Sequence, residues 1–228
     1  MCGRFTLTTP PEEIADCFAL DAVPELAPRY NIAPTQEVGT VQAGSSGARE
    51  FRRRRWGLVP HWSKDPRMGA RLINARSETL VEKPSFREAF RHRRCLVPAD
   101  GFYEWAGKGR GSRQPHHIRR PDRGPFAIAG LHERWRDEAG AWLETCTLVT
   151  VPANARLAPV HHRMPAILPP EQWDAWLDPE VADAVRLLPL LRPCPDSELE
   201  FAAVSRRVNR PQFDDPGCLA PATPEEAR

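Results

Sequence analysis

Cys2 has the most distinctive chemistry in the chain, because it directly follows Met1. Methionine is commonly removed when the next residue is small, and its removal here would make Cys2 the N-terminal residue. An N-terminal cysteine joins an α-amine with a pKa of about 8 to a thiol with a pKa of about 8.5. Such a residue is a bidentate nucleophile.

Three further polar residues could complete a site around this nucleophile: Asn74 in LINARSET, Glu104 in ADGFYEWAG and His161 in PVHHRMPAIL. A cysteine nucleophile needs a carboxylate or an imidazole to move protons, and an amide to orient a polar intermediate. Each residue also has an ordinary structural explanation. Glu104 could lie on the outer side of a strand, His161 could be a hydrogen-bonded loop residue, and Asn74 could cap a turn.

A second group of residues, in FRRRRWGLVPHW, combines arginines with aromatic rings. Trp56 and Trp62 flank a turn that contains Pro60, immediately after four arginines. Aromatic rings stack on bases while arginines bind phosphates, as in proteins that bind single-stranded nucleic acid. Alternatively, both rings lie in the core and alternate arginines of one strand point to solvent.

Charge is unevenly distributed, although the net charge is only +2. Basic residues far outnumber acidic ones between Arg49 and Arg94, whereas acidic residues dominate from Ile167 to Arg228. This asymmetry favours a basic face, and arginine suits bidentate phosphate contacts. Charge alone is equally consistent with an ordinary solvated surface.

The six cysteines are scattered along the chain: Cys2, Cys17, Cys95, Cys146, Cys194 and Cys218. They lack the CxxC or paired Cys and His spacing of zinc sites, and they do not resemble the disulfide framework of a small secreted protein. We therefore expect no metal, no cofactor and mostly buried thiols.

Residues 4–13 lack the apolar segment of a signal peptide, and no stretch of the chain is apolar enough to cross a bilayer. We therefore expect a soluble, cytoplasmic protein with no membrane partner.

Three segments are predicted to be helices. Thr9-Pro10-Pro11-Glu12 is typical of an N-cap with a capping-box glutamate, and predicts a helix that ends near Leu20. A second capping box, Ser85 to Glu88, predicts another helix. In PEQWDAWL, Trp173, Trp176 and Leu177 would share one face of a third.

Apolar or alternating runs bounded by glycine and proline predict most of the remaining structure to be strands. These runs are EVGTVQA, RCLVPADGFYEWAG, PHHIRR, FAIAGLHERW, ETCTLVTVPA and FAAVSRRV. Short connections favour antiparallel pairing. We predict an α+β fold, a single domain over residues 2–221 with a curved, barrel-like, mainly antiparallel sheet and peripheral helices, followed by a flexible tail at residues 222–228.

Seven segments, in order along the chain, resemble the signature blocks of the SOS response-associated peptidase (SRAP) family. They are MCGRF, YNIAPTQ, RWGLVPHW, INARSET, RCLVPADGFYEW, HHRMPAIL and VSRRVNRPQFDDPGCLAP. The resemblance implies a sensor of abasic sites in single-stranded DNA. It also implies a self-processing peptidase activity, which for this chain would remove only Met1.

The resemblance also implies a covalent mechanism. The freed amine of Cys2 would condense with the aldehyde of an open abasic sugar, and its thiol would close a thiazolidine ring. Glu104 would shuttle protons, and Asn74 would hold Cys2 and the sugar in register. Either His161 or His162 could act on the sugar oxygen, and we prefer His161.

By the same resemblance, other residues would bind the DNA. Arg4 and Arg76 would contact phosphates beside the lesion. Trp56, Pro60 and Trp62 would form a wedge and stacking surface. Asn31 would line the same pocket. We expect a monomer, cytoplasmic and associated with the nucleoid if bacterial, because a reaction that consumes one protein per lesion needs no second subunit.

Two other functions fit parts of the sequence. An N-terminal-nucleophile amidohydrolase would also use a processed cysteine, but such sites typically need an Asn-Gly oxyanion element, which the chain lacks. A non-catalytic single-stranded DNA-binding module would use the arginines and tryptophans and ignore Cys2. Its binding would be sensitive to salt and unchanged by Cys2→Ala.

Overall fold

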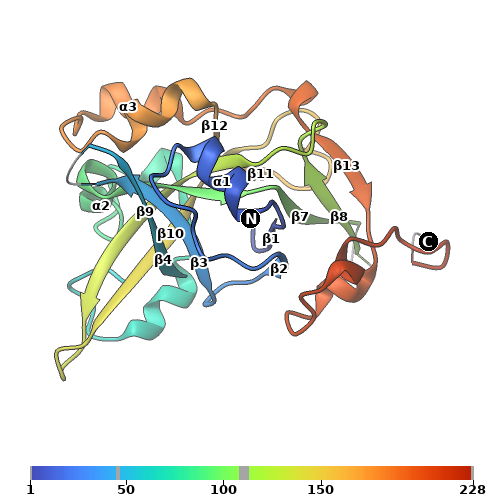
Figure 1. Cartoon of the computed structure of the whole chain (residues 1–228), viewed down its shortest axis with the longest axis horizontal. Helices are drawn as coiled ribbons and strands as arrows, with labels where there is room; N and C mark the ends of the chain where they lie inside the picture. Colours follow the sequence, from blue (N-terminus) through green and yellow to red (C-terminus); the bar gives the residue numbers. More distant parts are fainter. Residues whose placement is uncertain (1, 45–46, 108–112, 227–228) are drawn as a thin grey trace.

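The computed structural model describes residues 2–44, 47–107 and 113–226. In it, strands form two sheets that share one core, with short helices around them (Figure 1). Most strand pairs are antiparallel. Among the strand pairs described, the parallel ones are those of β10 with β4 and of β10 with β5. The predicted α+β class with a curved, mainly antiparallel sheet is confirmed.

The first sheet has five strands in the order β13-β8-β7-β1-β2. Their bounds are β1 Phe5–Leu7, β2 Arg29–Ile32, β7 Gly101–Ala106, β8 Gln114–Arg119 and β13 Glu200–Ala203. The N-terminal strand β1 therefore lies inside the sheet, between β7 and β2, and this position fixes the segment that carries Cys2.

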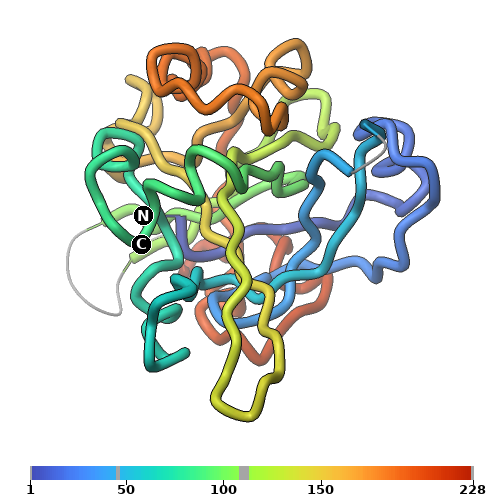
Figure 2. Tube along the Cα trace, turned by 90° about the vertical axis from the view of Figure 1, so that its left-hand side faces the viewer, coloured from blue at the N-terminus to red at the C-terminus, as the bar shows by residue number. Residues whose placement is uncertain are grey.

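The second sheet has eight strands, with β5 paired to β10 beside the main path. Their bounds are β3 Glu37–Ala43, β4 Arg49–Trp56, β5 Asn74–Arg76, β6 Arg94–Ala99, β9 Phe126–Arg136, β10 Trp142–Pro152, β11 Arg163–Pro165 and β12 Ile167–Leu168. The β9–β10 hairpin extends beyond the rest of the molecule, as the yellow segment of Figure 2 shows.

The two sheets pack their apolar faces into one cluster. Phe5, Phe102 and Ile118 contribute from the first sheet, and Val97, Ile128 and Leu148 from the second. Successive side chains of a strand point to opposite faces, and β6 and the middle of β10 are buried on both faces. Burial of this surface is the main force that holds the two sheets together.

The run RCLVPADGFYEWAG, which reads as one segment in the sequence, divides at Asp100 into β6 and β7, which belong to different sheets. Asp100 is buried, and its carboxylate accepts hydrogen bonds from the hydroxyls of Thr6, Thr8 and Thr9. These bonds fix the chain where β1 ends and the first helix begins.

The helices are short and lie at the periphery (Figure 1). They are α1 Pro11–Phe18, α2 Arg87–His92, α3 Trp173–Leu177 and α4 Ala184–Leu187. The predicted apolar face of α3 is confirmed, because Trp173, Trp176 and Leu177 are buried.

Both predicted capping boxes are wrong. Pro10 occupies the N-cap of α1 and Phe86 that of α2, and neither helix has a side-chain cap hydrogen bond. The hydroxyl of Thr9 donates to Asp100 instead. A tertiary carboxylate has therefore replaced the local cap.

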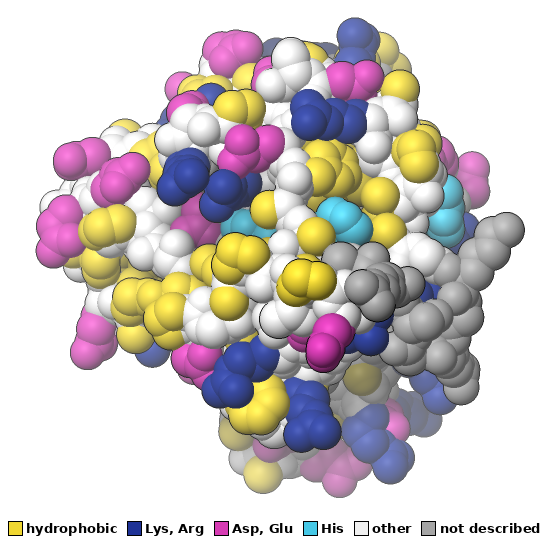
Figure 3. Space-filling model, turned by 90° about the vertical axis from the view of Figure 1, so that its right-hand side faces the viewer, with side chains coloured by type: hydrophobic (Ala, Val, Ile, Leu, Met, Phe, Trp, Pro, Cys, Tyr) yellow, Lys and Arg dark blue, Asp and Glu magenta, His cyan; other side chains and the backbone are white. Residues whose placement is uncertain are grey.

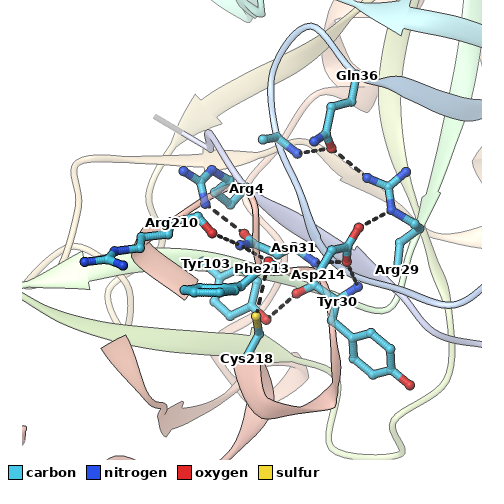
Figure 4. Close-up of polar contacts among 11 residues, drawn as sticks. Arg4, Arg29, Tyr30, Asn31, Gln36, Tyr103, Arg210, Phe213, Asp214 and Cys218 are labelled. Carbon is cyan, nitrogen blue, oxygen red and sulfur yellow. Dashed lines mark hydrogen bonds and ion pairs between the residues drawn. The ribbon is translucent and has the colours of Figure 1, made fainter. Parts of the chain in front are cut away.

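The C-terminal segment at residues 208–214 is hydrogen-bonded to the edge strand β2 (Figure 4). The buried Asn31 side chain donates to the backbone carbonyls of Val208, Arg210 and Phe213 at 3.1, 3.1 and 2.7 Å. The Asp214 carboxylate accepts from the backbone N–H groups at positions 30 and 31 and pairs with the side chain at position 29. An edge strand leaves backbone donors without a strand partner, and Asp214 supplies the acceptor.

Asp214→Ala is expected to lower the free energy of unfolding by about 2 kcal/mol, because two backbone N–H groups of β2 lose their acceptor. Urea unfolding measures the change. The matched control is Asp122→Ala, which removes an exposed pair with Arg120 and should change stability by less than about 0.5 kcal/mol. Equal effects of the two substitutions would contradict this role for Asp214.

Part of the predicted tail folds back on the domain. The Ala222 N–H donates to the Ala203 carbonyl at 3.1 Å, and the Glu226 carboxylate accepts from the Arg206 N–H at 2.9 Å. Residues 227–228 lie outside the described residues, so the flexible tail and the domain boundary at residue 221 stay predictions. Among the described residues, none of the helices has the length and apolar character needed to span a membrane.

Candidate active site

Strand pairing brings Cys2 to Glu104. Phe5 of β1 pairs with Phe102 of β7, and the Tyr103 N–H donates to the Arg4 carbonyl at 3.0 Å. Continuing this antiparallel register places Cys2 beside the end of β7. Glu104 shares a strand face with the core residue Phe102, so its carboxylate points inward, and the side chain is only 5% exposed. An outward position for Glu104 is therefore excluded.

Cys2 is fully buried and held by Asn74. The Asn74 side-chain amide donates to the Cys2 carbonyl at 2.8 Å. Asn74 begins β5, which pairs in parallel with β10 through Leu148, so its position is set by the second sheet. Burial, and next the charge of Glu104, raise the pKa of the Cys2 thiol well above its usual value. The thiol is therefore neutral near pH 7.

Glu104 and His161 lie next to each other. Glu104 Oε1 lies 3.8 Å from His161 Nδ1. Burial raises the pKa of Glu104 to about 7, and burial also lowers the pKa of His161 from its usual value. A carboxyl group that titrates near neutral pH can both accept and donate a proton under ordinary conditions.

His161 lies in the loop before β11, at a cleft of about 560 Å³ that Glu104 and Trp105 also line. The Arg163 backbone contacts His161 Nδ1: its N–H and its carbonyl oxygen each lie 3.0 Å away. His162 is exposed and stacks on His161 with ring centroids 4.5 Å apart. Of the two imidazoles, His161 is the one that pairs with Glu104.

The structure therefore brings together Cys2, Asn74, Glu104 and His161, the four residues that we predicted to be catalytic. Among the residues that the structure describes, no cluster of three His, Cys, Asp or Glu side chains could hold a metal ion. The arrangement can bind an electrophilic carbon at the Cys2 position and move protons to and from it.

Two of the predicted DNA contacts make internal hydrogen bonds. Arg4 donates through one guanidinium nitrogen to Asn31 Oδ1 at 2.8 Å (Figure 4). The same nitrogen donates to the Val208 carbonyl at 2.7 Å. Asn31 is fully buried and is satisfied by Arg4 and the C-terminal segment. Asn31 therefore holds the Arg4 guanidinium in place through a hydrogen bond. Its own side chain is buried and is not positioned to contact a ligand.

The two tryptophans of RWGLVPHW differ sharply. Trp56 is fully buried, packs edge-on against Phe5 at 5.2 Å and donates to the Ile73 carbonyl, so it presents no surface for stacking. Trp62 is 49% exposed, and Pro60 is buried behind it. The core interpretation therefore holds for Trp56, whereas Trp62 keeps a ring available to a ligand.

Trp62 shares a cleft with three basic residues and with Asp65, which pairs with Arg67. Trp62, Lys64, Arg67 and Arg71 line a second cleft, of about 900 Å³. Arg76, at the end of β5, is exposed two residues after Asn74. Elsewhere the charges are mixed: on the face in Figure 3, basic and acidic side chains alternate among hydrophobic ones.

Sequence reasoning missed an ion pair beside the site. Arg163, buried at the start of β11, pairs with Glu78 at 2.5 Å. Both residues lie within the blocks that contain Asn74 and His161, and their opposite charges, close to two candidate site residues, are the signal that could have identified them.

The chain is similar to known proteins over most of its length. A model of the SOS response associated peptidase (SRAP) family matches residues 1–211. The chain is 41% identical over 219 residues to "Abasic site processing protein YoqW" of Bacillus subtilis (strain 168), a match that covers 95% of this chain and 97% of YoqW. It is 34% identical over 226 residues to "Abasic site processing protein HMCES" of Gallus gallus, covering 85% of this chain and 66% of HMCES.

A solved structure of a protein from Bacteroides thetaiotaomicron has the same fold. Its TM-score is 0.86 at 25% identity, and the match covers 97% of this chain and all of the other (100%). The sequence blocks, the fold and the family match agree over nearly the whole chain. The chain therefore belongs to the SOS response associated peptidase family.

Proposed function

We propose that this protein processes abasic sites in single-stranded DNA by forming a covalent crosslink through Cys2 after Met1 is removed. The observation that carries the proposal is the buried Cys2, held by Asn74 and adjoining a carboxyl group, Glu104, that titrates near pH 7. The names of the relatives support the abasic site as the substrate. The crosslink shields the lesion from strand cleavage.

The chemistry begins on the sugar. His161 donates a proton to the ring oxygen while Glu104 takes the proton of the anomeric hydroxyl, so that the abasic deoxyribose opens to its aldehyde. The proton on Glu104 then returns to His161, 3.8 Å away. The Cys2 amine then attacks the aldehyde carbon, and Glu104 takes the proton that the amine loses. Glu104 passes this proton to the former aldehyde oxygen, which gives the carbinolamine, and then carries a second proton from the nitrogen to the hydroxyl group, which leaves as one water. An imine remains.

The thiol closes the ring. Its sulfur adds to the imine carbon while its proton passes, by way of Glu104, to the imine nitrogen. Because burial keeps the thiol neutral, the amine reacts first and the thiol second. The product is a five-membered thiazolidine, and the overall reaction loses one water. Asn74 holds the Cys2 backbone during both steps.

The DNA would enter past the exposed Arg76 and Trp62 and the half-buried Arg4. Arg76 and Arg4 would contact phosphates beside the lesion, and Trp62 with Lys64 and Arg71 would hold the adjoining nucleotides. We further propose that the protein acts as a monomer in the cytoplasm and removes its own Met1. The reaction would use only its own side chains and N-terminus.

Trp62→Ala is expected to weaken the binding of intact single-stranded DNA by about 1 to 3 kcal/mol, roughly 5- to 150-fold in Kd, because one base loses its stacking partner. Fluorescence anisotropy measures the change. Trp142→Ala, which removes an equally exposed ring on the β9–β10 hairpin, is the control and should leave Kd unchanged. The same loss in both variants would contradict a stacking role for Trp62.

A denaturing gel tests the function. Protein lacking Met1 is incubated with a single-stranded oligonucleotide that contains one abasic site, and with the intact oligonucleotide. The proposal predicts a heat-stable slow band with the abasic oligonucleotide only. If no band forms and the protein instead releases ammonia from glutamine, the amidohydrolase replaces this proposal. If the protein binds both oligonucleotides equally and forms no band, a non-catalytic DNA-binding module replaces this proposal.

A further inference from the structure

Arg163 connects two parts of the site that are far apart in sequence. Its guanidinium makes two hydrogen bonds to the Glu78 carboxylate, at 2.5 and 2.9 Å, and a third to the Thr150 carbonyl at 2.6 Å. Glu78 lies in the 3₁₀ turn Ser77–Thr79, directly after β5. The pair therefore ties the segment that carries Asn74 to the segment that carries His161.

The pair is firmly anchored. Arg163 is only 7% exposed, and its fork geometry matches the carboxylate better than a lysine would. Its hydrogen bonds lower the pKa of Glu78, so Glu78 is ionised at neutral pH. Thr150 belongs to β10, the strand that pairs with both β5 and β11, so the three segments meet at one point.

The backbone of Arg163 faces one nitrogen of His161. Both its N–H and its carbonyl oxygen lie 3.0 Å from Nδ1. When Nδ1 carries no proton, it accepts from the N–H group. When Nδ1 is protonated, it donates to the carbonyl. The backbone of one residue, Arg163, thus offers a partner for either protonation state, and the ring need not turn when the proton moves.

We propose that the Glu78–Arg163 pair is the positioning device of this site: it holds the Arg163 backbone against His161 so that Nδ1 can gain or lose a proton beside Glu104 without moving the ring. Glu78 and Arg163 act through His161 and do not touch the substrate. The expected effect on crosslinking rests on the proposed function, whereas the expected effect on the His161 ring does not.

The test uses Glu78→Gln, which removes the charge from a half-exposed position. The matched control is Glu200→Gln, which breaks the pair of Arg119 and Glu200, 2.6 Å apart with a similarly exposed carboxylate. Nitrogen NMR of ¹⁵N-labelled histidine reports the tautomer and pKa of His161. We expect a changed tautomer population and a lower pKa in Glu78→Gln, because the protonated ring loses its fixed acceptor, and no change in the control.

The rate of crosslinking at saturating DNA is the second readout. It should fall roughly tenfold to a hundredfold in Glu78→Gln, with Kd for intact DNA unchanged. Arg163→Lys, which keeps the charge and loses the fork, should give an intermediate loss. An unchanged His161 spectrum would overturn the inference. If the wild type forms no crosslink, the proposed function fails, and the NMR result still decides whether the Glu78–Arg163 pair positions His161.

Discussion

Cys2→Ala is expected to abolish the heat-stable adduct with abasic DNA, with a residual rate below the limit of detection. The variant keeps an N-terminal amine, which can form an imine, but it has no sulfur to close the ring. Binding of intact single-stranded DNA should be unchanged, because Cys2 is buried and makes no surface contact. The denaturing gel and anisotropy measure these two quantities on the same protein.

Two further variants sharpen this prediction. Cys218→Ala removes another buried, free cysteine and should leave the adduct unchanged. Cys2→Ser keeps the amine and offers a less nucleophilic oxygen, so its adduct should appear only after borohydride has reduced the imine. A heat-stable adduct with Cys2→Ala would mean that a different residue attacks the sugar.

Glu104→Gln is expected to slow crosslinking by about 10²- to 10⁴-fold, because the glutamine cannot carry protons between the amine, the carbinolamine and the thiol. With its pKa raised by burial to about 7, Glu104 should give a wild-type rate that rises with pH through about 7. That rise should be missing in Glu104→Gln. A variant that retained the wild-type pH profile would exclude Glu104 as the proton shuttle.

The same substitution should stabilise the protein at alkaline pH. The pKa of Glu104 is about 7 in the folded chain and about 4.5 in the unfolded chain, so the folded state holds its proton more tightly. The stability that this provides is fully present below about pH 4.5 and is lost as pH rises through about 7. Near pH 8, Glu104→Gln should therefore be more stable than the wild type by up to about 3 kcal/mol. Glu200→Gln, which changes a half-exposed carboxylate, should not raise the stability near pH 8.

Local patterns predicted most of the strands. EVGTVQA matches β3 residue for residue, because its alternating and β-branched residues fit a half-buried strand. The sequence did not reveal that RCLVPADGFYEWAG changes sheet at Asp100. That break depends on hydrogen bonds from Thr6, Thr8 and Thr9, which lie more than ninety residues earlier. Tertiary contacts of this kind leave no local signature.

The candidate site shows the same limit. Cys2, Asn74, Glu104 and His161 could be named from their chemistry and from the family blocks, but their proximity follows from the pairing of β1 with β7 and of β5 with β10. Non-local pairing cannot be deduced from propensity. The two tryptophans illustrate the point further, since identical residues six positions apart are buried in one case and exposed in the other.

The most direct test of the proposed mechanism is the intact mass of the adduct between the wild-type protein and an abasic oligonucleotide, followed by digestion to the N-terminal peptide. The thiazolidine mechanism predicts the mass of the chain without Met1 plus the oligonucleotide minus one water, with the sugar on Cys2 and no reductant needed. An adduct that retains Met1, that maps to a different residue, or that survives only after reduction would contradict the thiazolidine.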